Sequence, residues 1–162
     1  MSNFKIGLGG GCHWCTEAVF QSLKGVIYVE QGYISSIEKN SSFSEAVIVS
    51  YNPKIITTKD LITIHLLTHK STINHSFREK YRSAIYYFND NQRSTIETII
   101  TELSKDFNNE LITKIMEFNI FKPSRKELIN YYQNNPKKPF CKKYIDPKLV
   151  LLRERYSDKM HL

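Results

Sequence analysis

The sequence predicts a single α+β domain in which helices cover a mixed β-sheet, and three observations lead to that class. Short runs of β-branched and aromatic residues alternate with stretches of helical periodicity along the chain. Two of the predicted strands follow each other with no helix between them, which is unlike a doubly wound parallel sheet. The 162 residues suffice for one sizeable core but not for two.

Strands and helices alternate through the first half of the chain. Phe4 to Leu8 form an apolar run that ends in a triple glycine, after which the periodicity becomes helical. A polar loop, residues 35–44, separates the two consecutive strands. The expected elements are a strand at residues 4–8, a helix at 16–23, strands at 26–34 and 46–51, and a helix at 60–69 that Thr57 or Thr58 caps.

The second half begins with a polar stretch, KSTINHSFREK, which we interpret as a functional loop leading into a core strand. Asn89 or Asp90 can cap the helix that follows, because Ile96 to Leu103 place one apolar stripe on it. The expected elements are strands at residues 84–88 and 111–118, a helix at 124–132 opened by a capping box, and an irregular basic tail at 135–162. We expect the core of the sheet to be ferredoxin-like, with the strand order left open.

The net charge of +7 does not by itself indicate a nucleic-acid-binding protein. The 23 Lys and Arg residues are spread along the whole chain and accompany no recognised nucleic-acid-binding motif. The N-terminus lacks the basic start and apolar run of a secretory signal, and no stretch approaches the roughly 20 apolar residues of a membrane span. We therefore expect a cytoplasmic protein whose three cysteines serve thiol chemistry rather than a disulfide framework.

Cys12 is the strongest candidate for a reactive residue. It follows Gly9, Gly10 and Gly11 at the point where the first strand passes into a helix. Backbone N–H groups and the positive end of the helix dipole stabilise a thiolate at such a place, and the glycines leave the sulfur unshielded. A glycine run before a helix can instead bind phosphate, but the spacing of a phosphate-binding P-loop is absent.

The C-x-x-C spacing of Cys12 and Cys15 leaves two interpretations open. It is typical of thioredoxin-like redox pairs and also of half of a metal site. His65 and His69, one helical turn apart, would complete four zinc ligands, although they lie far from the cysteines in the sequence. We favour the redox interpretation, with His65 as a partly buried helix residue and His69 as a helix-end residue.

A third cysteine, Cys141, lies in the densest basic segment of the chain, PKKPFCKKY. Cationic neighbours favour a thiolate over a thiol, so this cysteine is a second candidate for reactivity. A solvated tail with an incidental cysteine is the alternative interpretation. The flanking lysines are Lys137, Lys138, Lys142 and Lys143.

Several segments in chain order carry a resemblance to a known family. They are GGGCHWCTEAVFQSLKGV, Gly32-Tyr33, SEAVIVSYNP, KYRSAIYY and NPKKPFCKKYIDPKL, and together they extend from Ile6 to Leu149. In this order they resemble the A-type peptide methionine sulfoxide reductases, the peptide-methionine (S)-S-oxide reductase family. The resemblance implies one reductase domain over residues 1–162 that reduces methionine-S-sulfoxide, free or in proteins, and so repairs oxidised proteins.

The resemblance implies a catalytic role for three residues. Cys12 would attack the sulfoxide sulfur while Glu45 protonates the oxygen, which leaves a sulfenic acid on Cys12. Cys141 would then condense with the sulfenic acid to form a disulfide, and a thioredoxin-like donor would reduce it by exchange. The apolar run that follows Glu45 suits a carboxyl group that donates a proton near neutral pH. No metal or organic cofactor is implied.

Four further residues match substrate-binding positions of the family. Trp14 would line the pocket for the methyl group on sulfur, with His13 beside it. Tyr33 and Tyr81 would hydrogen-bond the sulfoxide oxygen through their hydroxyl groups and stabilise charge as it develops. By composition alone Trp14 and both tyrosines are also ordinary core residues, and Glu45 an ordinary exposed one.

The sequence departs from the family pattern at several of these places. His13 stands where the family usually has phenylalanine, which weakens an apolar methyl pocket and adds a polar ring beside Cys12. Ser76 stands at the family's loop aspartate, and Phe43-Ser44 replaces histidine-alanine before the glutamate. These changes bear on substrate affinity and turnover more than on the fold.

Two other functions are compatible with the same residues. One is a thiol-disulfide oxidoreductase or redox relay that uses Cys12, Cys15 and Cys141 without sulfoxide turnover. The other is a binding module that recognises oxidised methionine without converting it. We expect a monomer, because an enzyme that exchanges disulfides must present its tail to a protein partner. Whether Cys15 competes with Cys141 as the resolving thiol is left open.

Overall fold

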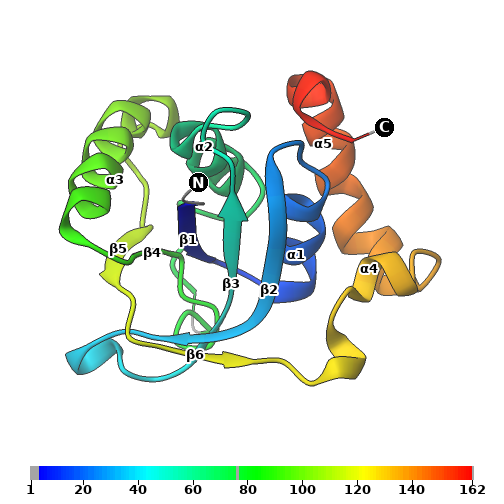
Figure 1. Ribbon diagram of the computed structural model, residues 1–162, viewed down its shortest axis with the longest axis horizontal. Coiled ribbons are helices and arrows are strands. Elements are labelled where there is room, and N and C mark those ends of the chain that lie inside the picture. The colour runs from blue at the N-terminus through cyan, green and yellow to red at the C-terminus, as the bar shows by residue number, and fades with distance from the viewer. Residues whose placement is uncertain (1–3, 76, 162) are drawn as a thin grey trace.

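The computed structural model describes residues 4–75 and 77–161, whose strands form one sheet in the order β5-β4-β1-β3-β2-β6 (Figure 1). Neighbouring strands are antiparallel except β4 and β5, which are parallel, so the sheet is mixed as predicted. The strands are β1 (Phe4–Gly9), β2 (Val26–Ser35), β3 (Ser44–Tyr51), β4 (Ala84–Tyr87), β5 (Lys114–Glu117) and β6 (Ile120–Pro123).

The central four strands and the first two helices form the ferredoxin-like core that the sequence predicted. Along the chain the order is β1-α1-β2-β3-α2-β4, and in the sheet these strands are arranged β4-β1-β3-β2. The helices are α1 (His13–Gln21), α2 (Thr58–Leu67), α3 (Asp90–Leu103), α4 (Tyr131–Asn134) and α5 (Asp146–Tyr156). Figure 1 shows α1, α4 and α5 together at one end of the sheet and α2 with α3 at the other.

Cap residues that the sequence predicted begin α2 and α3. Thr57 accepts a hydrogen bond from the Asp60 N–H at 3.0 Å while the Asp60 carboxylate accepts one from the Thr57 N–H at 3.3 Å, which is a capping box at the start of α2. The Asn89 side chain accepts a hydrogen bond from the Gln92 N–H at 2.8 Å at the start of α3.

Strand β3 separates two hydrophobic clusters, and every one of its residues is buried. Val47, Val49 and Tyr51 face the larger cluster, which α1, α2, α3 and α5 complete. Ala46 and Ile48 face a smaller cluster with Met116 and the partly buried Phe121 of the edge strands. This alternation fixes the register of β3, because a slip of one residue would exchange the two faces.

The region after α3 differs from the sequence prediction. The strand expected at residues 111–118 is limited to β5, and the edge strand β6 was not predicted. The helix expected at residues 124–132 is wrong, because only a 3-10 turn, Lys126–Leu128, forms before Asn130. Asn130 has a φ of 57°, a left-handed conformation that a helix cannot contain, and α4 begins after it.

The C-terminal tail is helical, and its irregularity is that it changes from one helix type to another. A π-helical turn, Cys141–Ile145, leads directly into α5, and a 3-10 turn, Ser157–Lys159, follows α5. Ile145, Leu149 and Leu152 bury their side chains in the larger cluster. The tail therefore packs against the body of the protein and brings Cys141 into its core.

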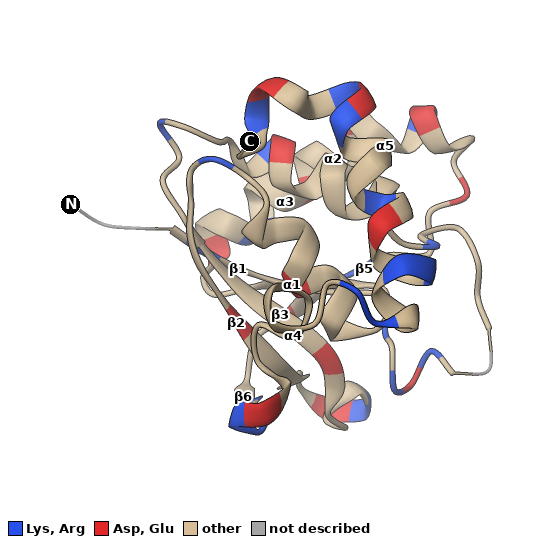
Figure 2. Ribbon diagram, turned by 90° about the vertical axis from the view of Figure 1, so that its right-hand side faces the viewer, with Lys and Arg blue, Asp and Glu red and all other residues tan. Residues whose placement is uncertain are grey.

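Charged residues are intermixed over the face shown in Figure 2, where Lys and Arg positions alternate with Asp and Glu along helices and loops. This agrees with the even distribution of basic residues along the sequence. No helix among residues 4–75 and 77–161 has the length and apolar character that a bilayer crossing requires.

Candidate functional site

Cys12 is the N-cap residue of α1, directly beyond the end of β1. Its backbone is extended, with φ −60° and ψ 127°, and its carbonyl accepts the N–H groups of Cys15 at 3.1 Å and Thr16 at 3.3 Å. A Cβ at Gly10 would approach the His69 ring to 2.4 Å, so the turn that leads to Cys12 needs a glycine there. The thiol is therefore held at the positive end of a helix and is partly exposed.

The neighbouring thiol of Cys15 prepares Cys12 for ionisation. The pKa of Cys12 is lowered, first by a hydrogen bond from the Cys15 thiol and then by the main-chain N–H groups of Trp14 and Cys15, although burial and the charge of Glu45 oppose the shift. The pKa of Cys15 is raised far above its usual value, because it gives this hydrogen bond and is buried. The Cys15 thiol thus acts as a hydrogen-bond donor that favours ionisation of Cys12.

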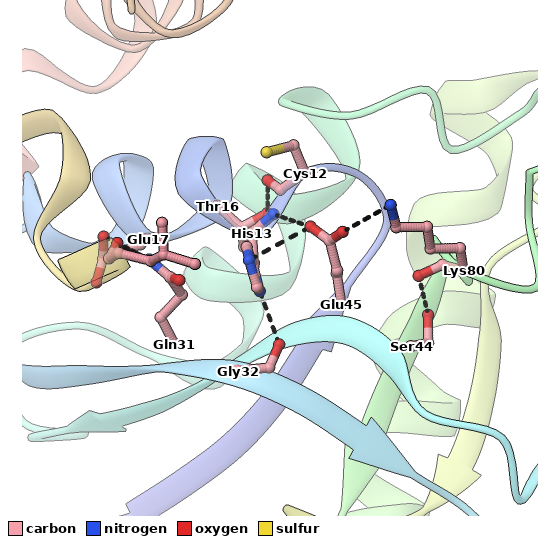
Figure 3. Close-up of polar contacts among 10 residues, drawn as sticks. Cys12, His13, Thr16, Glu17, Gln31, Gly32, Ser44, Glu45 and Lys80 are labelled. Carbon is pink, nitrogen blue, oxygen red and sulfur yellow. Dashed lines mark hydrogen bonds and ion pairs between the residues drawn. The ribbon is translucent and has the colours of Figure 1, made fainter. Parts of the chain in front are cut away.

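Glu45 is buried next to Cys12, with 6% of its surface exposed. The main-chain N–H of His13 donates to its Oε1 at 3.1 Å, and the Nζ atom of Lys80 lies 3.7 Å from its Oε2. Figure 3 shows the carboxyl group between His13 and Lys80, while the Cys12 sulfur points away from it along α1. The apolar surroundings expected for Glu45 are therefore only part of its environment.

His13 lies beneath Glu45. Its Nδ1 is 2.8 Å from the carbonyl oxygen of Gly32, so Nδ1 carries a proton and donates it to that bond. Its Nε2 is 3.5 Å from Oε1 of Glu45, and the ring is 3% exposed (Figure 3). The imidazole therefore presents a polar atom to the carboxyl group, which a phenylalanine at this position could not do.

The two tyrosines occupy different parts of the site. Tyr33 lies opposite Glu45 in the β2–β3 ladder and packs edge-on against His13, with ring centroids 5.1 Å apart. Tyr81 lines a cavity that opens on Cys12, and the Lys80 ammonium lies 5.1 Å from the centroid of its ring. Both side chains are partly exposed beside the Cys12–Glu45 pair, whereas Ser76, the other predicted position in this loop, is outside the described residues.

Trp14 is covered by the tail. Its ring stacks on Tyr131 at a centroid distance of 4.0 Å and an interplanar angle of 7°, and Phe140 meets it edge-on at 5.3 Å. Its indole N–H is buried, without a hydrogen-bond partner among the residues that the structure describes. A methyl-binding role for Trp14 would therefore place the pocket for the methyl group where α1 contacts Tyr131 and Phe140.

Cys141 is fully buried, in the same hydrophobic cluster as Cys15, and Cys12 packs against that cluster. Its pKa is raised, first by burial and then by the charge of Asp146, and Lys138 opposes this only in part. The prediction that the flanking lysines favour its thiolate is therefore wrong, because Lys142 and Lys143 are exposed residues and the Lys143 ammonium lies over the Tyr144 ring. All three cysteines are free thiols in this structure.

Glu17 anchors the segment that leads to Cys141. Its carboxylate is completely buried and accepts the main-chain N–H groups of Asn130 at 3.0 Å and Tyr131 at 3.2 Å, together with the Gln31 side chain at 3.0 Å. Burial raises the pKa of Glu17, while these hydrogen bonds act against the rise. These contacts fix where residues 130–131, which lead into the tail, lie against α1.

The two histidines of the zinc hypothesis are used in hydrogen bonds. Nε2 of His65 is 2.8 Å from the Gly9 carbonyl oxygen, and the ring of His69 contacts the His65 carbonyl and the Ser83 hydroxyl group. Burial lowers the pKa of His65 to about 4, so its ring is neutral at physiological pH. No group of three or more potential metal ligands occurs within residues 4–75 and 77–161.

A cavity of about 560 Å³ opens beside Cys12, on the side of Cys15 rather than of Glu45. The loop after α2 and the tail form much of its wall. Its lining includes the side chains of Cys15, His69, Arg78, Tyr81, Phe140 and Lys148.

Sequence reasoning missed Lys80, Lys148 and Tyr131 as members of this site. Lys80 precedes Tyr81 directly, and that adjacency is the one sequence signal for it. Lys148 and Tyr131 reach the site only because the tail folds back across α1, which local periodicity does not predict.

A family model described as peptide methionine sulfoxide reductase matches residues 4–160. The peptide methionine sulfoxide reductase MsrA of Deinococcus radiodurans is 35% identical over 167 residues, covering 93% of this chain and 81% of that protein. The protein of the same name from Sulfolobus acidocaldarius is 30% identical, covering 94% of each chain.

Solved structures share the fold. Mxr1 from Saccharomyces cerevisiae in its reduced form superposes with a TM-score of 0.76 at 23% identity, covering 86% of this chain and 89% of that one. The same yeast protein in complex with Trx2 superposes with a TM-score of 0.64 at 24% identity, covering 77% and 83%. The family match spans every site residue described above, including those of the tail.

Proposed function

This chain belongs to the peptide methionine sulfoxide reductase family, and from that premise we propose that it reduces methionine-S-sulfoxide, free or in proteins, through a sulfenic acid on Cys12. The observation that carries the proposal is the Cys12 thiol at the N-terminus of α1, with a lowered pKa and with a buried carboxyl group, Glu45, beside it. A nucleophile and a proton donor within one site are what sulfoxide reduction requires.

In the first step the Cys12 sulfur attacks the sulfur atom of the sulfoxide and forms a bond to it, while Glu45 gives a proton to the sulfoxide oxygen. The oxygen is then transferred to the Cys12 sulfur and the bond between the two sulfurs breaks, which releases methionine and leaves Cys12 as a sulfenic acid. The sulfoxide is thereby reduced by two electrons and the thiol is oxidised by two. Tyr33 and Tyr81 would donate hydrogen bonds to the same oxygen. His13 is a positioning residue, because its main-chain N–H and ring both hold Glu45.

In the second step another cysteine loses its proton and attacks the sulfenic sulfur as a thiolate, and the displaced OH takes up a proton and leaves as water as the disulfide forms. Cys141 is assigned this role by its match to the family tail, and Cys15 is the neighbouring thiol that competes for it. An external dithiol of the thioredoxin type then reduces the disulfide, as the yeast relative crystallised with Trx2 suggests. The proposal uses no metal or organic cofactor, and a monomer in the cytoplasm is the expected form.

The test is single-turnover reduction of the separate S and R epimers of N-acetyl-methionine sulfoxide by the reduced enzyme, without added reductant. The proposal predicts about one methionine released per protein from the S epimer, a sulfenic acid trapped by dimedone at Cys12 when Cys15 and Cys141 are replaced by serine, and neither product with Cys12→Ser. Disulfide exchange with an unreactive sulfoxide would contradict it and favour the redox relay.

A further inference from the structure

The cavity beside Cys12 has an unbalanced charge. Its wall includes three cationic side chains, Lys70, Arg78 and Lys148, and among its described lining residues there is no aspartate or glutamate. None of the three makes an ion pair within the described chain. Glu45, the buried carboxyl group of this site, contacts His13 and Lys80 and is not among the residues that line the cavity.

Lys148 lies in the cavity wall, near enough to Cys15 and Cys12 for their charges to act on it. It projects from α5, is partly buried, and donates a hydrogen bond from Nζ to the Thr68 carbonyl oxygen. Burial lowers its pKa, whereas the charges of Cys15 and Cys12 act to raise it. A partly buried ammonium group without a carboxylate partner gains more from an incoming anion than a fully solvated one does.

The other two cations are held around the same opening. The Arg78 guanidinium donates to the carbonyl oxygens of Gly10 at 2.9 Å, Tyr81 at 3.0 Å and Ile73 at 2.8 Å, so its position is fixed and its charge is not neutralised by a carboxylate. Lys70, at the end of the α2 region, is exposed and free to reach toward a ligand. These groups make the cavity a preformed site for negative charge.

We propose that this cavity is a subsite for a carboxylate group of the sulfoxide substrate, bound by Lys148 and Lys70. The inference rests on the proposed function and adds a substrate class to it. The α-carboxylate of a free or C-terminal methionine sulfoxide is only a few bonds from the sulfur that Cys12 attacks, and an aspartate or glutamate next to it in a peptide extends slightly farther. At about 560 Å³ the cavity has the volume of an ordinary ligand pocket, roughly 300–1,000 Å³.

The experiment compares matched substrates that differ only in this charge, with dithiothreitol as the reductant. N-acetyl-methionine-S-sulfoxide carries the carboxylate and its carboxamide does not. We expect wild type to prefer the anion about tenfold in kcat/KM, and added salt to reduce that preference. The ratio of the two kcat/KM values is the readout, because a change in thiolate stability at Cys12 affects both substrates alike.

Three variants locate the preference. Lys148→Met and Lys70→Met remove one charge each from the cavity wall, and each should lower the ratio, Lys148→Met bringing it close to one. Lys54→Met removes an exposed lysine from the loop between β3 and α2 and should leave the ratio at its wild-type value. Lys70→Met keeps the test informative if Lys148→Met does not fold, because Lys70 is exposed.

A peptide pair identifies the source of the carboxylate. Acetyl-methionine-S-sulfoxide-aspartate amide and its asparagine counterpart differ only in a neighbouring side-chain charge. A preference for the aspartate peptide assigns the subsite to acidic sequences, and a preference limited to the free α-carboxylate assigns it to free and C-terminal residues. Equal rates for both pairs in wild type, or an unchanged ratio in both cavity variants, would overturn the subsite while leaving sulfoxide reduction intact. Absence of turnover with every substrate would instead refute the proposed function.

Discussion

Two regions that meet at Cys12 are built in different ways. The oxygen side, formed by Glu45, His13, Tyr33 and Lys80, depends on the register of β2 and β3, which places Tyr33 opposite Glu45. The thiol side, formed by Cys15, Cys141 and Lys148, depends on a tail that returns across α1. The oxygen side is thus fixed by the sheet, whereas the thiol side is fixed by a small number of contacts such as those of Glu17.

This difference suits the two halves of the proposed reaction. Proton donation to a sulfoxide needs groups that are already in position, which a sheet register provides. Disulfide formation and its reduction by another protein need thiols that can approach each other and then a partner, which a separately anchored tail provides. The comparison predicts that substitutions on the two sides affect different steps.

Glu45→Gln should have the largest effect among substitutions on the oxygen side. Removing a general acid costs about 10²- to 10⁴-fold, so we expect single-turnover methionine release to fall at least a hundredfold. The exchange of a preformed disulfide with dithiothreitol should be unchanged, because that reaction has no oxygen to protonate. Glu79→Gln, an exposed position in the adjacent loop, is the matched control, and a Glu45→Gln enzyme of wild-type rate would remove the proposed acid.

Glu17→Gln should weaken the thiol side through stability. The buried carboxylate accepts two main-chain N–H groups of the tail, and replacing such an acceptor costs about 1–3 kcal/mol of the free energy of unfolding. Urea unfolding measures the loss, with the exposed Glu127→Gln as control. Sulfoxide reduction in single turnover should change much less than thioredoxin-supported turnover does.

The same carboxyl group gives a pH dependence of known sign. The pKa of Glu17 is raised in the folded protein, so the native state binds its proton more tightly than the unfolded state does. Its contribution to stability is complete below the unfolded pKa of about 4.3 and is lost as the pH rises through the folded value. The advantage of wild type over Glu17→Gln in the free energy of unfolding should therefore narrow as the pH rises above the unfolded pKa, and a widening gap would contradict the assignment.

Cys15→Ala should reduce the reactivity of Cys12 at neutral pH by about tenfold. The hydrogen bond from the Cys15 thiol is the main cause of the lowered pKa of Cys12, so its removal moves ionisation of Cys12 to higher pH. Alkylation by iodoacetamide, followed across pH in a background without Cys141, reports this shift. Cys15→Ser keeps a donor and should shift less, and equal profiles for the alanine variant and wild type would show that Cys15 does not act on Cys12.

His13→Phe should have the smallest effect, a loss of about three- to fivefold in single-turnover methionine release. The substitution keeps the main-chain N–H that donates to Glu45 but removes the ring that lies 3.5 Å from the carboxyl group. A faster enzyme after the substitution would show that the imidazole hinders the sulfoxide step instead of supporting Glu45.

The sequence alone was enough to predict the turn and the strands that carry Cys12, Tyr33 and Glu45. The glycine turn before Cys12 and the β-branched runs at residues 26–34 and 46–51 are local signals, and they predicted β1, β2, β3 and the start of α1 within a few residues. Glu45 and Tyr33 were identified by resemblance, and the sheet register brings them together.

The part of the chain after α3 was harder to predict, for three physical reasons. Edge strand β6 has four residues, too few for a periodic pattern, and its pairing with β2 is a long-range contact. The left-handed conformation of Asn130 ends a segment whose composition favours a helix. Helix α5 buries only Leu149 and Leu152 along its length, so its apolar stripe is too narrow to recognise, and Lys148 could not be placed at the site.

The most direct test of the two-sided account compares Glu45→Gln with Cys141→Ser in both single-turnover and thioredoxin-supported assays with methionine-S-sulfoxide. The account predicts that Glu45→Gln slows methionine release in both assays. Cys141→Ser should release its first methionine at the wild-type rate and then lose turnover with thioredoxin. A Cys141→Ser enzyme that is slow in the first turnover, or that turns over normally with thioredoxin, would contradict the separation of the two sides.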